Sequence, residues 1–188
     1  MDILLETARL RLRRFDVGDV DRLVELDSDP EVMRYITFGT PTPRQSYVDT
    51  HLPRWFDIYA RQPGCGYFAA ERRETGEFLG WFHLRDDRLE AGYLELGYRL
   101  RRNAWGQGYA TEGGRGLVRH AFDTVGGERL SARTLERNLA SQRVMQKCGF
   151  SFAGRFEYPQ DVLAGRSADE RAAVKYVLTR SEWFSRRD

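Results

Sequence analysis

Cysteine, histidine and lysine are scarce in this chain of 188 residues. Its two cysteines, Cys65 and Cys148, are too few and too far apart for a disulfide framework or a cysteine-rich metal site. We expect Cys148 to pack as a small apolar residue and not to act as a nucleophile. His51 and His83 have no metal-ligand partner at a familiar spacing, so the sequence predicts no metal.

Long apolar runs and clustered charges are missing as well. No stretch approaches the roughly 20 residues of a membrane-spanning helix, and the acidic start, Met1–Glu6, lacks the parts of a signal peptide. Together with the few cysteines, this predicts a soluble protein of the cytoplasm. The 30 basic and 28 acidic residues are spread along the chain, which argues against nucleic acid as a partner.

The apolar content is sufficient for one hydrophobic core. Hydrophobic residues make up 41% of the chain, and its length lies within the usual range of one domain, roughly 100 to 200 residues. There is no internal repeat and no low-complexity linker. We therefore expect residues 1–188 to form a single domain.

The pattern of apolar residues predicts an α/β (α+β) chain. Alternation predicts strands, and helical spacing predicts helices after Asp19, within 41–63 and after Gly108. Glu74–Glu77 has the composition of a β-hairpin turn. The predicted strands are 10–13, 67–70, 78–84, 93–100, 130–134, 150–156 and 172–178, and a further short helix is predicted over 140–147.

A turn of small residues precedes the helix expected after Gly108. Gly106 and Gly108 allow a tight turn in which several backbone N–H groups point at one anion, beside the positive end of the helix dipole. A pyrophosphate fits this description. The Gly-Lys-Ser/Thr ending of a nucleoside triphosphate loop is missing, and the third glycine of a dinucleotide loop would fall at Thr111. The alternative is that the two glycines only end a strand and open a helix.

Three segments in this order closely resemble the GCN5-related N-acetyltransferase (GNAT) superfamily: Glu95–Tyr98, Trp105–Glu112 and Asn138–Phe150. The likeness is nearest to the branch of the ribosomal-protein alanine N-acetyltransferases, whose members open much as Thr7–Arg13 and Asp29–Met33 do here. It covers almost the whole chain.

The resemblance implies a single-domain acyl-CoA N-acyltransferase fold, with a mixed, mainly antiparallel sheet that splays open and is flanked by helices. Acetyl-CoA, as cosubstrate, would lie between the strand of Glu95 and the strand near Leu130. Trp105 stands where the family usually has glutamine or arginine. By the same resemblance, the coenzyme-binding residues are Leu96, Gly97, Tyr98, Gly106, Gln107, Gly108, Tyr109, Ala110, Thr111, Asn138, Ser141 and Arg143.

Several of these residues also have a structural explanation. Asn138 and Ser141 are both residue types that cap helices. Gly97 marks either a β-bulge or a close approach to the strand backbone. Gly113 and Gly114 are unusual inside a helix, and close helix packing or an approaching ligand would explain them.

For catalysis, the resemblance points to Glu95 as the base that takes a proton from the acceptor amine. The alternative is that Glu95 is an acid on the outer face of a strand, and Glu112 is a weaker candidate for the base. A backbone N–H near Leu96 or Gly97 would stabilise the oxyanion if the strand is bulged there. Ser141 would help the thiol to leave.

The sequence thus predicts an acetyl-CoA-dependent N-acetyltransferase that acts on a primary amine, either a protein N-terminus, for example of a ribosomal protein, or a small molecule. The alternatives are a non-catalytic acyl-CoA sensor on the same scaffold and a structural protein with a coincidental glycine turn. Residues 37–63 and 159–171, with Trp81 and His83, are expected to form the acceptor pocket. The pattern leaves monomer and homodimer open.

Overall fold

One eight-stranded sheet organises the protein, and the computed structural model describes residues 2–186. The strands follow the order β1-β2-β3-β4-β5-β6-β8-β7, and all neighbours are antiparallel except β5 and β6. The strands are β1 (Ile3–Glu6), β2 (Leu10–Arg14), β3 (Gly66–Arg72), β4 (Phe78–Asp86), β5 (Leu94–Leu100), β6 (Arg129–Leu135), β7 (Ser151–Glu157) and β8 (Ala172–Thr179). The expected mixed, mainly antiparallel sheet is confirmed.

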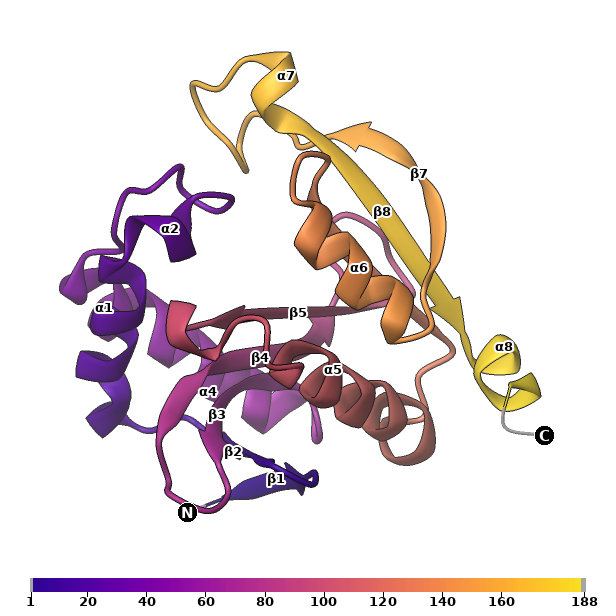
Figure 1. Ribbon diagram of the computed structural model, residues 1–188, viewed down its shortest axis with the longest axis horizontal. Helices are drawn as coiled ribbons and strands as arrows, with labels where there is room; N and C mark the ends of the chain where they lie inside the picture. Colours follow the sequence, from indigo (N-terminus) through magenta and orange to yellow (C-terminus); the bar gives the residue numbers. More distant parts are fainter. Residues whose placement is uncertain (1, 187–188) are drawn as a thin grey trace.

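Helices cover both faces of this sheet (Figure 1). On one side α1 contacts β4 and α4 contacts β3, while α5 crosses β2, β4 and β5, and α6 contacts α5 and β6. The helices are η1 (Val17–Asp19), α1 (Val20–Ser28), α2 (Pro30–Met33), α3 (Arg44–Ser46), η2 (Tyr47–His51), α4 (Leu52–Arg61), η3 (Arg102–Ala104), α5 (Tyr109–His120), η4 (Ala121–Val125), α6 (Leu139–Lys147), α7 (Ala168–Arg171) and α8 (Arg180–Ser185).

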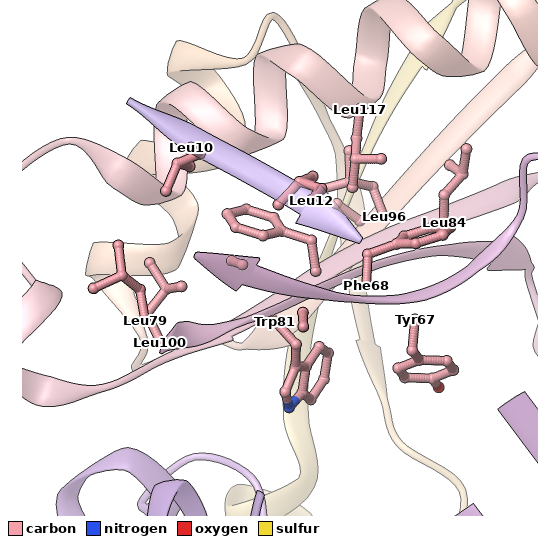
Figure 2. Packing of buried hydrophobic residues seen from close by; sticks show 14 of the residues in the cluster. Leu10, Leu12, Tyr67, Phe68, Leu79, Trp81, Leu84, Leu96, Leu100 and Leu117 are labelled. Carbon is pink, nitrogen blue, oxygen red and sulfur yellow. The ribbon is translucent and has the colours of Figure 1, made fainter. Parts of the chain in front are cut away.

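Strand alternation divides the apolar side chains between the two faces of the sheet. Figure 2 shows Leu12 and Leu96 on the side of Leu117 from α5, whereas Tyr67 and Trp81 project to the opposite side. All five side chains are buried, and one continuous core joins the sheet to helices on both faces. The two faces therefore carry different residues, and only one of them presents Trp81.

Several elements differ from the sequence expectation, since β1, α2 and the short helices η3, α7 and α8 were not predicted. Residues Ile3–Glu6 form β1, which pairs with β2 and was not predicted. Pro30, expected only to limit the preceding helix, occupies the first turn of α2, where Asp29 accepts a hydrogen bond from the Glu31 N–H. Proline is tolerated there because the first N–H groups of a helix have no intrahelical partner.

The sheet opens between β5 and β6. These parallel strands are paired only at Leu94 with Leu130 and at Glu95 with Ser131. Beyond Glu95 the two strands diverge, and β7 and β8 run obliquely to β5 in Figure 1. From Leu96 onward, the edge of β5 that faces β6 consequently has no partner strand.

The glycines within α5 are explained by close packing. A Cβ atom at Gly113 would lie 2.3 Å from Cζ of Phe82, and one at Gly114 would lie 2.7 Å from Sγ of Cys148. Because real Cβ atoms do not approach that closely, both positions require glycine to seat α5 on β4 and α6. Of the two explanations open from the sequence, helix packing is the one observed.

A buried ion cluster joins β2, η1 and β3. Arg13 is only 3% exposed, and its guanidinium donates to Asp19 at 2.7 Å and to Glu71 at 2.9 Å. Burial opposes the ionised form of Asp19, but the hydrogen bonds from Arg13 and the Asp16 backbone, together with the charges of Arg13 and Arg22, outweigh it and lower the Asp19 pKa. This cluster fixes β2 against β3. The turn between β1 and β2 contacts the glycine turn before α5, through Arg9 and the Gln107 carbonyl.

Candidate active site

The glycine turn presents a row of free backbone donors. Gly106 and Gly108 have φ angles of 73° and 84°, which glycine adopts without strain. Gly108 is the N-cap of α5 and provides no side-chain cap. Within residues 2–186, no backbone acceptor is recorded for the N–H groups from Gly106 to Thr111. An anion such as a pyrophosphate would satisfy several of these donors at once.

The turn is held from both sides. Trp105, which replaces the usual first residue of the loop, donates from Nε1 to the Leu100 carbonyl at 2.8 Å. Arg9 donates from Nη1 to the Gln107 carbonyl at 3.0 Å and lies over the Tyr109 ring at 4.4 Å. The loop therefore keeps its shape without using its own N–H groups.

Glu112 also helps to hold the glycine turn, and its hydrogen bonds do not suit the role of catalytic base. Its carboxylate accepts from Thr7 Oγ1 at 2.6 Å and from the backbone N–H and Nε of Arg9, each at 2.7 Å. Burial opposes ionisation, but these hydrogen bonds prevail and lower the Glu112 pKa. A carboxylate so engaged fastens the β1–β2 turn to the first turn of α5.

Leu96, Gly97 and Tyr98 lie on the part of β5 whose outer edge is unpaired. The pairing of β5 with β4 runs without a bulge through Gly97. Gly97 is required for another reason, because a Cβ atom there would lie 2.6 Å from Cε1 of His83 on β4. The close approach is therefore that of a side chain across the strand backbone.

Asn138, Ser141 and Arg143 come from the start of α6. The Asn138 side chain accepts from the Ser141 N–H at 3.2 Å and donates to Thr134 Oγ1 at 3.0 Å, so it caps the helix. Burial raises the Tyr98 pKa, and the Ser141 side chain, across the opening of the sheet, opposes this effect. Arg143 is exposed, and no acidic partner for it is recorded in the described part of the chain.

Glu95 lies at the point where β5 and β6 separate, and its side chain is only 16% exposed. The expectation of an outward-facing surface acid is therefore wrong. Burial raises the Glu95 pKa, whereas the paired guanidinium of Arg85 lowers it. The nearer oxygen of Glu95 also lies 3.9 Å from His83 Nε2. Neither partner was identified from the sequence.

The sheet face that carries Glu95 is lined by aromatic rings. Trp55 of α4 stacks on Tyr67 with ring centroids 4.5 Å apart, and His83 lies 5.0 Å from Tyr67 and 5.8 Å from Trp81. Trp55 comes from the 37–63 segment, which the sequence assigned to the acceptor pocket. These rings form the wall next to Glu95.

The second segment assigned to that pocket, 159–171, reaches the first one. Arg166 lies over the ring of Phe38 at 4.0 Å. The two segments that the sequence assigned to the acceptor pocket thus meet in the folded protein.

Asp27 was missed by the sequence reasoning. It is fully buried in α1 and accepts from Tyr47 and Arg99, each at 2.5 Å. An aspartate on the apolar face of an amphipathic helix was the available signal. Asp27 orients Arg99, which lies over Trp81 at 5.0 Å.

Neither a reactive thiol nor a cluster of metal ligands is found among the described residues. Cys148 is buried, and burial raises the pKa of its thiol to about 12. No group of three potential metal ligands gathers within residues 2–186. None of the helices in this range has the length and apolar character needed to cross a bilayer.

Known proteins resemble this chain in sequence and in fold. Residues 9–151 match a family described as "Acetyltransferase (GNAT) domain". The FsC-acetyl coenzyme A-N(2)-transacetylase of Aspergillus fumigatus is 33% identical over 96% of this chain and 77% of its own length. A GNAT-family acetyltransferase of Bacillus anthracis has a TM-score of 0.76 at 22% identity, covering 96% of this chain and 99% of its own.

A ribosomal alpha-N-protein acetyltransferase solved with coenzyme A also has a TM-score of 0.76, at 16% identity, covering 95% of this chain and 98% of its own. The splayed sheet and the open donors of the glycine turn are thus found in a chain whose sequence matches the family over most of its length. The protein belongs to the GNAT acetyltransferase family and is an acetyl-CoA-dependent N-acetyltransferase.

Proposed function

We propose that the protein transfers the acetyl group directly to a primary amine that is bound, together with acetyl-CoA, on the sheet face of Glu95. The observation that carries this proposal is the separation of β5 from β6 immediately after Glu95. An extended pantetheine arm can add to the free strand edge by backbone hydrogen bonds. The thioester then lies beside a buried carboxylate.

The N–H groups from Gly106 to Thr111 bind the pyrophosphate of the coenzyme in this proposal, and Leu96 to Tyr98 hold its arm. The free guanidinium of Arg143 reaches a coenzyme phosphate. Asn138 contributes by capping α6, which positions Ser141. Two observations support this assignment. Among the described residues, the N–H groups from Gly106 to Thr111 have no backbone acceptor, and Arg143 is exposed.

During the reaction, Glu95 accepts the proton that the amine loses, either directly or through an intervening group. Although β5 has no bulge here, its edge toward β6 is unpaired beyond Glu95, so whichever N–H of Leu96 or Gly97 points to that edge stabilises the oxyanion. Ser141, whose side chain lies near Tyr98, supplies a proton to the departing thiolate. The raised pKa of Glu95 supports the first role, because a more basic carboxylate takes a proton more readily.

The charges near Glu95 favour an acceptor that is not a polycation. The acids Glu95 and Asp27 are each paired with an arginine. Arg54 and Arg88, in contrast, are exposed and form no salt bridge among the described residues, although the charge of Arg88 acts on Glu95. Since like charges repel at short range, we propose a small amine with neutral or acidic neighbouring groups. The Aspergillus fumigatus relative is named an N(2)-transacetylase, which is consistent with an acceptor that is acetylated on nitrogen.

We also propose that residues 1–188 act as one domain in the cytoplasm, as a monomer or a homodimer.

The test is a free-thiol assay with acetyl-CoA and a panel of amines that includes amino-acid amides, acidic dipeptides, peptides that begin with alanine or serine, and spermidine. We expect turnover with the neutral or acidic amines and little with spermidine. Binding of acetyl-CoA without turnover of any amine would support the sensor alternative instead.

Glu95→Gln tests the assignment of the base within the same assay. We expect a fall in kcat of at least about 100-fold with little change in acetyl-CoA affinity. Glu74→Gln, an exposed acid in the β3–β4 turn, is the matched control and should leave kcat unchanged. Equal losses of kcat and of coenzyme affinity in Glu95→Gln would assign Glu95 a structural role.

A further inference from the structure

His83 is a buried side chain with unused hydrogen-bonding groups. It is 8% exposed, and within residues 2–186 neither Nδ1 nor Nε2 has a hydrogen-bond partner. Leaving a buried polar group unpaired costs stability, and most proteins avoid it. Such a residue on the reacting face of an enzyme requires an explanation.

The backbone of β5 is shaped to admit the His83 ring. His83 on β4 pairs with Gly97 on β5, and a Cβ atom at position 97 would lie 2.6 Å from Cε1 and 2.8 Å from Nε2 of the ring. The imidazole therefore lies directly across the bare backbone of β5. Gly97 is on the stretch of β5 whose other edge is unpaired, so the ring reaches toward the open edge proposed for the thioester.

Burial and the neighbouring arginines keep the His83 ring neutral. Burial lowers the His83 pKa well below its usual value, and the cations that add to this effect are Arg85, Arg88 and Arg99. Glu95, 3.9 Å from Nε2, is the nearest acid. The other groups facing this region are Tyr67 of β3, His51 of η2, Asp27 of α1, which is paired with Arg99, and Tyr158 beyond β7.

Arg85 already occupies the Glu95 carboxylate, whereas the unprotonated nitrogen of the neutral His83 ring has no partner and can accept a proton. The lowered pKa makes His83 a weak base towards a free ammonium, but the amine nitrogen becomes strongly acidic as it bonds to the thioester carbon, and at that stage His83 can take its proton. Glu95 in turn is close enough to stabilise an imidazolium. The two side chains have the arrangement of a base and its supporting carboxylate.

We propose that His83 is a catalytic residue that receives the proton from the attacking amine, with Glu95 stabilising the imidazolium; this deepens the proposed function and rests on it. The amine nitrogen forms a bond to the thioester carbon, and the bond from that carbon to sulfur breaks. The amine proton passes to His83, and the thiolate takes a proton from Ser141 or from water. His83 returns its proton to solvent by way of Glu95, and Ser141 regains one, which completes the cycle.

The competing explanation is that His83 is only one ring in the aromatic wall with Tyr67 and Trp81. His83→Phe separates the two, because phenylalanine keeps a ring at this position and removes the unpaired nitrogens. A packing role predicts that activity is kept. A catalytic role predicts a loss of kcat together with unchanged or increased thermal stability, since an unsatisfied buried group has been removed.

The experiment compares His83→Phe and His83→Gln with His120→Gln, which replaces another buried histidine whose Nε2 faces the Gly64 carbonyl at 2.9 Å. We measure kcat with an amine accepted by the wild type, coenzyme A affinity by calorimetry, and the melting temperature of each variant. The expected result is a fall in kcat of at least about 100-fold in both His83 variants, with coenzyme affinity within about twofold of wild type and His120→Gln near wild type in kcat.

A kcat within about fivefold of wild type in His83→Phe would overturn the proposal, and so would a loss of kcat and melting temperature together in both His83 variants. The activity of the wild-type protein distinguishes a failure of the His83 proposal from a failure of the proposed function. If the wild type binds the coenzyme but acetylates no amine, the function itself fails. If the wild type is active and His83→Phe equally so, only the role of His83 is refuted.

Discussion

Replacing Gly113 with alanine tests how firmly α5 and its coenzyme turn are seated on the sheet. The added Cβ would lie 2.3 Å from Cζ of Phe82, whereas ordinary contact begins at 3.4 Å. The helix or the ring must therefore move by about 1 Å, the difference between these values. Phe82 is fully buried and cannot turn into solvent, so we expect most of the displacement to occur in α5.

The expected magnitude follows from two opposing effects. Alanine gains about 1 kcal/mol over glycine in helix propensity. Overpacking a filled core costs about 1–3 kcal/mol, and the contact with a fully buried ring places this site toward the upper end. We expect the free energy of unfolding to fall by about 1–2 kcal/mol. Because the displaced helix carries the N–H groups of Tyr109 to Thr111, the KM for acetyl-CoA should rise several-fold.

Urea unfolding and steady-state kinetics measure both effects, with Gly116→Ala as the matched control in the same helix. Its Cβ would meet only the ends of the Thr7 and Leu5 side chains, at 3.1 and 3.3 Å, so it should be neutral or slightly stabilising. Adding Phe82→Leu to Gly113→Ala should lower the KM for acetyl-CoA again. The reasoning is refuted if Gly113→Ala is as stable as Gly116→Ala and binds acetyl-CoA normally.

Three further predictions concern the support of the site. Arg13→Met leaves the buried carboxylates of Asp19 and Glu71 without their cation and should lower the free energy of unfolding by about 3–5 kcal/mol, measured in urea. Glu112→Gln weakens the attachment of Arg9, so the KM for acetyl-CoA should rise while kcat stays constant. The pKa of Glu112 is lower in the folded state than in the unfolded state, so the ionised carboxylate stabilises the fold fully above the unfolded pKa, and this stabilisation is lost as pH falls through the folded-state pKa. The stability difference between Glu112→Gln and wild type should therefore shrink over that acidic range. Coenzyme A at about 100 times its Kd should stabilise the wild type by about 2.7 kcal/mol, whereas an unchanged melting temperature would exclude binding.

The sequence alone determined seven of the eight strands, the longer helices and the coenzyme turn. Short-range patterns carry this information, since alternation along 94–100 defines β5 and the small residues from Gly106 to Ala110 define the turn and the start of α5. The placement of Glu95 on the face opposite Leu96 also followed from alternation. The short strand β1 escaped prediction because four residues with weak alternation become a strand only through pairing with β2.

The tertiary structure decided which side chains meet. Glu112 became an anchor because the β1–β2 turn, about a hundred positions earlier in the chain, brings Arg9 and Thr7 to it. The pairing of β4 with β5 places His83 and Arg85 beside Glu95 and explains Gly97. Hydrogen bonds, burial and charge act through space over a few ångströms, and the register of strands and the seating of helices set those distances. A linear pattern therefore names the residues that can do chemistry, and only the folded arrangement assigns their partners.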